Sequence, residues 1–219
     1  MVAARHMKLL FVSVGVPRDI VSNGRTITTG IYKNSVAGRV RVRTTNIDGD
    51  RQADLSVHGG VDKAVYAYPQ EHYPFWENEL GRTDLPPGQF GENLTTSGLL
   101  EEDVRIGDIF SIGSTHFEVS QPREPCFKLA LRTDSPGILK RFIQTQRTGF
   151  YLRVMQEGEI EAGDSVSRLK TDPEQMTVKE VFDVAYGESG TRENIERALQ
   201  MPALADAWRT MFNKRLAAK

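Results

Sequence analysis

The chain contains a single cysteine, Cys126, in a short stretch (residues 121–128) that also carries two prolines and two cations. One cysteine cannot form an internal disulfide, so a chemical role for it would rest on its thiolate, as a nucleophile or a metal ligand. Arg123 and Lys128 place positive charge near the thiol and favour the thiolate, and the prolines stiffen the loop. The alternative is a buried thiol that acts as a small hydrophobic side chain.

Residues 57–64 form a first glycine-containing cluster that could contact a ligand. The adjacent Gly59 and Gly60 allow the backbone to approach a ligand closely or to form an anion-binding nest. His58 could donate to a phosphate or a carbonyl group, and Lys63 could pair with a phosphate. An ordinary turn explains the same pattern, so this cluster alone assigns no function.

Two further clusters have a similar character. In residues 90–95, Glu92 and Asn93 follow a glycine and could present an acceptor and an amide to the edge of a heterocycle. In residues 28–33, Lys33 follows a glycine-containing turn, as phosphate-binding lysines often do. Taken alone, the first of these clusters is better explained as an ordinary loop.

The composition argues against several classes of protein. The 219 residues are enough for one large domain, or for one domain with a small appendage. The net charge of −1 gives no electrostatic case for binding a nucleic acid polymer or a membrane surface. No apolar run is long enough to span a bilayer. A single cysteine argues against a secreted disulfide framework and favours a cytoplasmic location.

Familiar cofactor and metal motifs are missing from the sequence. The four histidines and one cysteine do not have the paired spacing of zinc ligands. There is no Walker motif, no dinucleotide glycine fingerprint and no set of iron–sulfur cysteines. Cations and glycine-rich corners near one thiolate instead favour an anionic ligand together with a soft metal or sulfur centre.

Residues 8–170 are predicted to form a mainly β, barrel-like domain, because short apolar or alternating runs are separated by glycine-containing corners. Strands are expected within residues 9–14, 36–42, 104–110, 115–120, 150–154 and 165–169. Two helices are expected to interrupt them, at about residues 69–80 and 137–143, where apolar residues recur at helical spacing. Residues 1–7 have no signal-peptide pattern and are interpreted as an expression scar outside the fold.

Residues 171–219 are predicted to form a three-helix module. Thr177 and Glu180 match a capping box, Thr191 can cap a second helix, and Pro202 is expected at the start of a third. Apolar residues then line one face of each helix. With no chemical motif in this segment, a packing appendage is the favoured interpretation.

Several motifs, taken together in their order and spacing, resemble the MOSC domain family, the C-terminal domain of molybdenum cofactor sulfurases. Within it, they are similar to the bacterial branch linked to 6-N-hydroxylaminopurine resistance, which carries a C-terminal three-helix module. The resemblance covers nearly the whole chain after Met7. It rests on Thr29-Gly30-Ile31-Tyr32-Lys33, Asp54 with His58-Gly59-Gly60, Asp62-Lys63-Ala64-Val65, Gly91-Glu92-Asn93-Leu94, Gly107-Asp108, and Gln121-Pro122-Arg123 with Pro125-Cys126 and Lys128.

The resemblance implies a β-barrel-like core that binds the molybdenum cofactor, molybdopterin, with Cys126 as the protein ligand to molybdenum. A soft thiolate suits such a centre. It also implies an oxidoreductase that reduces N-hydroxylated compounds, such as 6-N-hydroxylaminopurine, to amines. Because molybdopterin carries a phosphate, we expect cations and backbone donors around it. The candidate cofactor contacts are Lys33, His58, Gly59, Gly60, Lys63, Asn93, Arg123 and Lys128.

The reaction requires a proton donor and a source of electrons. Glu92 or Asp62 could supply the proton as oxygen leaves as water, although Asp62 could instead form a salt bridge with Lys63 or Arg51. Without a flavin, nicotinamide or iron–sulfur motif, the electrons are expected from a separate reductase. The chain is expected to act as a monomer or homodimer.

Two other functions remain open from the sequence. One is a carrier of the molybdenum cofactor, or a sulfur-transfer module that uses a persulfide on Cys126. The other is a MOSC-like fold that has lost its cofactor and serves as a binding module.

Overall fold

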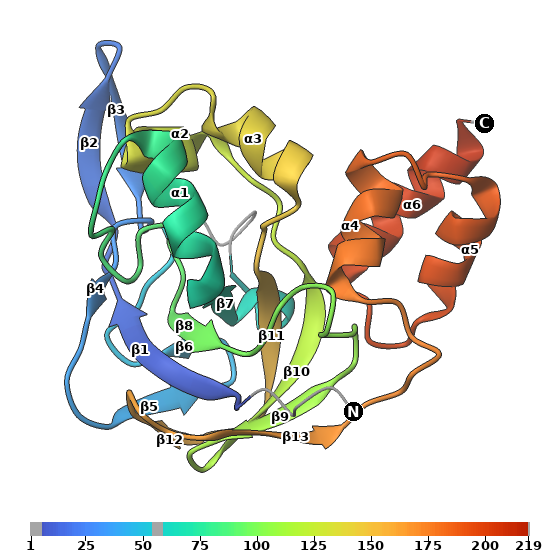
Figure 1. Cartoon of the computed structure of the whole chain (residues 1–219), viewed down its shortest axis with the longest axis horizontal. Helices are drawn as coiled ribbons and strands as arrows, with labels where there is room; N and C mark the ends of the chain where they lie inside the picture. The colour runs from blue at the N-terminus through green and yellow to red at the C-terminus, as the bar shows by residue number, and fades with distance from the viewer. Residues whose placement is uncertain (1–5, 54–58, 219) are drawn as a thin grey trace.

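The computed structural model describes residues 6–53 and 59–218, and within them the chain folds into thirteen strands and six α-helices. An eight-stranded mixed sheet has the order β13-β9-β10-β11-β7-β8-β1-β4, and two smaller sheets contain β12-β5-β6 and β2-β3 (Figure 1). The strands are β1 (Lys8–Val14), β2 (Arg18–Ser22), β3 (Arg25–Thr29), β4 (Asn34–Ser35), β5 (Val40–Arg43), β6 (Asn46–Ile47), β7 (Val65–Pro69), β8 (Leu94–Ser97), β9 (Ile109–Ile112), β10 (Thr115–Pro122), β11 (Phe150–Gln156), β12 (Gly158–Ile160) and β13 (Val166–Lys170).

The large sheet closes on itself, which gives the barrel-like core that the sequence predicts. Strand β1 pairs with β8 and β4, and its first residues also bond to the segment that leads into β13. Leu9 N donates to Asp164 O at 3.0 Å, and Val166 N donates to Met7 O at 3.1 Å. Met7 therefore takes part in the fold, although the sequence analysis placed it in the expression scar.

Three helices lie over the end of the barrel where β7 and β8 run in parallel: α1 (Tyr73–Leu80), α2 (Phe127–Thr133) and α3 (Ile138–Thr145). The first and third were expected, and α1 begins at Tyr73 because residues 70–72 form a 3₁₀ turn. Helix α2 was not predicted. An aromatic cluster that includes Tyr68, Trp76 and Phe142 fills the space beneath these helices.

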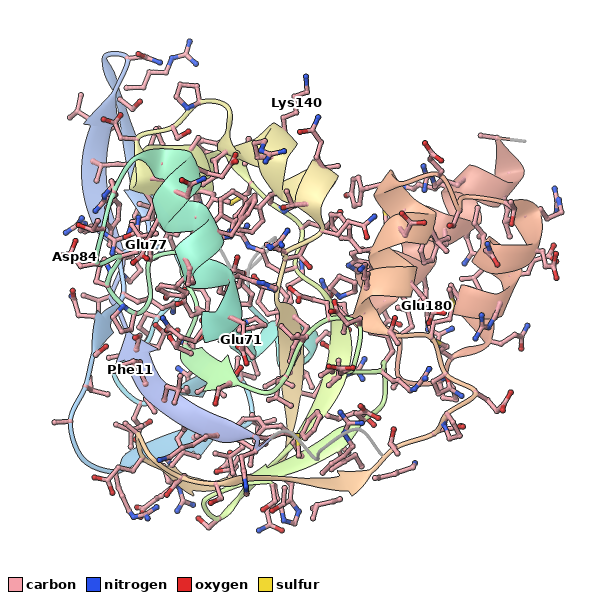
Figure 2. The ribbon with its side chains drawn as sticks, viewed as in Figure 1. Phe11, Glu71, Glu77, Asp84, Lys140 and Glu180 are labelled. Atoms are coloured by element: carbon pink, nitrogen blue, oxygen red, sulfur yellow. The ribbon has the colours of Figure 1, made fainter. Side chains whose placement is uncertain are left out.

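The C-terminal residues form α4 (Val178–Tyr186), α5 (Arg192–Gln200) and α6 (Asp206–Ala217), grouped beside β10 (Figure 1). The capping box at the start of α4 is confirmed: Thr177 accepts from Glu180 N, and Glu180, labelled in Figure 2, accepts from Thr177 N. Thr191 caps α5 as predicted. The predicted start of the third helix at Pro202 is wrong, because residues 202–204 form a turn and α6 begins at Asp206.

The helical module and the barrel share one hydrophobic core. Buried residues of α4 to α6, among them Phe182, Trp208 and Phe212, belong to the same cluster as the barrel residues Leu9 and Phe117. Burial of this much apolar surface holds the module firmly on the barrel. The predicted boundary after Lys170 falls at the end of β13, and the division into two domains stays a prediction.

Candidate functional site

One pocket brings together most of the residues that the sequence analysis selected. It occupies about 690 Å³ including its open mouth, and its walls come from the end of β3, the loops around residues 50–53 and 90–93, and the start of α2. Seven of the predicted site residues line it: Lys33, Gly59, Lys63, Asn93, Arg123, Cys126 and Lys128. His58 lies outside the described residues, and Gly60, Asp62 and Glu92 are not among the described residues that line the pocket.

Cys126 is partly exposed and lies at the N-cap of α2, immediately before Phe127. Its backbone is extended, and its carbonyl accepts a hydrogen bond from Leu129 N, which turns the chain into the helix. The thiol is therefore not a buried filler of the core. It faces a pocket that a ligand can enter.

Arg123 is buried, with 4% of its surface exposed, yet its Nη1 has no hydrogen-bond partner among the described residues. Its guanidinium carbon lies 5.5 Å from the ring centre of Tyr66 and 5.6 Å from that of Phe142. Burial opposes the charge of Arg123, whereas Tyr66 and Cys126 favour it, and its pKa is raised overall. A buried cation with an unused donor is costly unless an anion binds it.

Lys33 is also buried, and its ammonium group contacts Asp50. Burial lowers the pKa of Lys33, and the charge of Asp50 opposes that shift. The same carboxylate oxygen of Asp50 accepts from Gly15 N at 2.9 Å. Lys33 therefore lines the site as one half of an ion pair, and the carboxylate of Asp50 compensates much of its positive charge.

Asn93 lines the pocket wall but uses its amide to join strands. Its Oδ1 accepts from Tyr66 N at 3.1 Å, and its Nδ2 donates to Ser13 O at 3.2 Å. These bonds link the residue just before β8 to β7 and β1. The predicted contact between Asn93 and the pterin stays a prediction, and the observed bonds give this residue a structural role.

Glu92 is fully buried, and its carboxylate holds the loop that forms one wall of the pocket. It accepts from Gly88 N at 2.9 Å, from Phe90 N at 3.0 Å and from the hydroxyl groups of Tyr73 and Thr95. All four hydrogen bonds are accepted by its carboxylate oxygens, and Glu92 is not among the described residues that line the pocket, so the geometry gives it a structural role.

We expect Glu92→Gln to destabilise the protein strongly. The amide would turn one acceptor into a donor against the N–H and O–H groups that now bond to the carboxylate. The free energy of unfolding should fall by about 3–5 kcal/mol, the usual cost of breaking a buried charged network. Urea denaturation of wild type and variant measures this loss in the free energy of unfolding. A loss below about 1 kcal/mol would contradict this role.

Asp62 faces the C-terminal module and not the pocket. Its Oδ1 accepts from Arg153 Nε at 2.6 Å, and its Oδ2 accepts from Asp206 N, at the start of α6, at 3.2 Å. A salt bridge to Lys63 or Arg51 was the alternative expectation for Asp62, and its observed ion pair is with Arg153. A proton-donor role for Asp62 therefore has no support in the geometry.

Glycine forms the tightest points of the pocket wall. A Cβ atom at Gly91 (φ 86°) would lie 2.8 Å from Cγ1 of Ile31, so the loop of residues 88–93 could not pack against residues 29–33 with a larger residue there. Gly59, with φ 107°, also needs the freedom of glycine. The predicted anion-binding nest of Gly59 and Gly60 stays a prediction.

Among the pocket residues that the sequence did not single out are Asp50, Tyr66, Glu124 and Tyr151. Tyr66 lies on β7 and Tyr151 on β11, and their ring centres are 5.2 Å apart. They occur in apolar runs that look like buried strands, so no sequence signal separates them from core residues. Glu124 was detectable, because it lies within the cysteine stretch itself.

The described residues contain no group of three or more histidine, cysteine, aspartate and glutamate side chains that could hold a metal ion. A metal at this pocket would need ligands beyond those that the described residues provide. Among the described residues, no helix is long and apolar enough to cross a membrane.

Comparison with known proteins agrees with this architecture. The MOSC domain matches residues 54–167, and the YiiM-like 3-alpha helix domain matches residues 176–218. The chain belongs to the MOSC domain family. The gap between the two matches, residues 168–175, falls where the fold changes from barrel to helical module. The MOSC match includes Cys126 and the pocket residues that follow position 58.

MOSC relatives cover nearly the whole chain. Protein YiiM of Escherichia coli is 35% identical over 87% of this chain and 86% of its own length, and YflK of Bacillus subtilis is 41% identical over 94% and 93%. The crystal structure of YiiM from Geobacillus stearothermophilus aligns with a TM-score of 0.82 at 37% identity, covering 96% of this chain and 99% of that one. A protein of Gibberella moniliformis named Reductase is 37% identical over 88% of this chain but only 35% of its own length.

Proposed function

We propose that this MOSC protein binds the molybdenum cofactor in the pocket at Cys126 and reduces N-hydroxylated compounds, such as 6-N-hydroxylaminopurine, to amines. The electrons come from a separate reductase. The observation that carries the proposal is the pairing, in one pocket, of an accessible thiol with a buried arginine whose Nη1 has no partner among the described residues.

The residues of the pocket fit an anionic cofactor that brings its own metal. Arg123 offers an unused donor, and Lys63 and Lys128 add positive charge to the lining. The thiol of Cys126 provides one soft ligand, and the described residues offer no complete metal site, so the remaining ligands would come from the cofactor. When bound, the cofactor would supply the two-electron chemistry. Molybdenum cofactor binding thus suits this donor set better than a protein-only metal site does.

The protein's own residues would bind the cofactor, orient it and exclude water from the pocket. Arg123 would hold the anionic part of the cofactor between Tyr66 and Tyr151, where burial strengthens the interaction. Cys126 would fix the metal end at the start of α2. The Glu92 loop and the Asn93 amide keep the opposite wall rigid, which preserves the spacing between these two anchors.

The comparison with the fungal protein named Reductase supports an oxidoreductase activity. The match covers 35% of that protein's length, so the name describes a larger chain of which this protein resembles one part.

The proposal predicts turnover with a chemical donor and none with NADH alone. Protein produced in a host that makes the cofactor in excess should reduce 6-N-hydroxylaminopurine to adenine when reduced methyl viologen supplies electrons. Product formation is followed by chromatography. Reduction by the isolated protein with NADH alone would contradict the need for a separate reductase. A protein that carries molybdenum but reduces no N-hydroxylated compound would favour the carrier function.

A further inference from the structure

Two arginines from separate elements share the ring of one tyrosine. The guanidinium carbon of Arg18 lies 3.6 Å from the ring centre of Tyr32, and that of Arg132 lies 4.9 Å from the same centre. Arg18 is the first residue of β2, Arg132 lies in the last turn of α2, and Tyr32 lies between β3 and β4 (Figure 1). The two guanidinium carbons are separated by no more than the sum of these distances, so one phosphate group could contact both.

The described part of the chain supplies no anion for these two cations. Among the described residues, none accepts a hydrogen bond from the guanidinium group of Arg18 or Arg132, and neither group forms an ion pair. Arg132 is half-buried, and its Nε is buried without a hydrogen-bond partner. Stacking on Tyr32 offsets only part of the cost of removing this guanidinium group from water.

The electrostatic surroundings of Arg132 are unfavourable for a cation. Burial lowers the pKa of Arg132, and the charges of Arg18 and Arg82 lower it further. Tyr32 and Glu92 oppose this shift. The carboxylate of Glu92 is buried, however, and its oxygens already accept four hydrogen bonds. Three cations therefore act on one another around the ring, and an added anion would relieve their repulsion.

A second ring with two arginines shows what is missing at Tyr32. The guanidinium carbons of Arg141 and Arg147 lie 5.5 and 4.2 Å from the ring centre of Phe75. There, Arg141 donates two hydrogen bonds to the carboxylate of Glu79. At Tyr32 no described carboxylate takes this place, which leaves the position to an anion from outside the chain.

We propose that Arg18 and Arg132, together with the ring of Tyr32, bind the phosphate group of a small molecule at a second anion site. Two arginines favour phosphate because each planar guanidinium group can donate two parallel hydrogen bonds to its oxygens. A doubly charged anion also compensates both cations. Tyr32, Arg18 and Arg132 are not among the described residues that line the Cys126 pocket, so this site is separate from the one proposed for the cofactor.

The site is tested by titrating inorganic phosphate into cofactor-free Arg123→Met protein in a calorimeter, with chloride keeping the ionic strength constant. The Arg123→Met background removes the buried donor of the Cys126 pocket, which would otherwise contribute phosphate binding of its own. We expect saturable binding, and a second substitution, Arg132→Gln, should raise Kd for phosphate at least about tenfold. Arg18→Gln should do the same, and because Arg18 is exposed this substitution should not disturb folding.

Arg141→Gln is the matched control, because it removes a ring-stacked arginine whose charge Glu79 already compensates. It should leave Kd for phosphate unchanged. The proposal would be overturned if phosphate does not bind to Arg123→Met protein, or if Arg132→Gln and Arg18→Gln leave Kd within twofold of that background.

Two further titrations identify the source of the phosphate group. Equal affinity for inorganic phosphate and adenosine monophosphate would support a site that recognises the phosphate group alone. Tighter binding of adenosine monophosphate that Arg132→Gln weakens would support a nucleotide site. Binding of a heptaglutamate peptide, with no binding of either phosphate compound, would overturn the proposal in favour of an acidic protein surface. Because these measurements use cofactor-free protein, their failure would leave the proposed function untouched.

Discussion

Replacing Cys126 with serine is expected to abolish reduction of 6-N-hydroxylaminopurine and to leave the fold intact. Serine differs by one atom, so the N-cap of α2 and the partly exposed position tolerate it. The hydroxyl is a hard, largely protonated group and does not replace a soft thiolate as a metal ligand. Turnover with reduced methyl viologen should therefore fall to background, while the thermal unfolding midpoint stays within a few degrees of wild type.

A matched control separates the effect of losing the Cys126 thiolate from the effect of removing any sulfur-containing side chain. Met155 is an exposed thioether on β11, outside the described pocket lining, and Met155→Ala should keep wild-type turnover. Residual activity of Cys126→Ser above about one tenth of wild type would exclude the thiolate as an essential ligand, because loss of a single supporting contact costs about that much.

Arg123→Met is expected to lower cofactor retention sharply and to stabilise the cofactor-free protein. The substitution removes a buried guanidinium with an unused Nη1 and leaves an unbranched side chain in the aromatic setting of Tyr66 and Phe142. Relieving an unsatisfied buried charged donor should raise the free energy of unfolding by about 1 kcal/mol. The molybdenum bound per chain should fall at least about tenfold, because the anion loses a buried charge-assisted donor.

Arg153→Met is the matched contrast for this experiment. Its guanidinium bonds to Asp62, Glu118 and Ala203 O, so its removal leaves those groups unpaired. Urea denaturation should show a loss of stability, the opposite sign to Arg123→Met. If both substitutions destabilise the cofactor-free protein to the same extent, Arg123 is an ordinary structural arginine, and the anion site is not where we place it.

The sequence was sufficient to predict elements whose signals are local. Thr177 and Glu180 form the predicted capping box, and Thr191 caps α5, because a cap depends on residues three positions apart. The third helix was placed too early: Pro202 suits a first helical turn, but the chain first makes a turn that brings Ala205 N to Ser120 O. Tertiary contacts decided that boundary.

Helix α2 was missed for a related reason. It has seven residues, follows two prolines, and mixes cations with apolar side chains, so it offers no readable helical period. Within the site, too, the sequence predicts only what local patterns carry. Lys33, Arg123 and Cys126, which the motifs selected, all line one pocket. Which polar residues face the pocket and which brace its walls depends on packing between distant segments.

Glu92 and Tyr186 illustrate that limit. Glu92 looks like a catalytic carboxylate in sequence, yet its hydrogen bonds use it as a structural anchor. Tyr186 lies in a segment without any chemical motif, yet it bonds to the pocket residue Glu124, sixty-two positions away. Neither arrangement leaves a local signature, because each depends on how separate elements pack.

The most direct test of the account is the molybdenum content per chain of wild type and Cys126→Ala, after expression in a host that makes the cofactor in excess. Both proteins are purified in parallel, and the metal is measured by mass spectrometry against protein concentration. The account predicts near-stoichiometric molybdenum in wild type and almost none in the variant. Equal molybdenum in the two proteins would contradict the assignment of Cys126 as the ligand on which the proposed function rests.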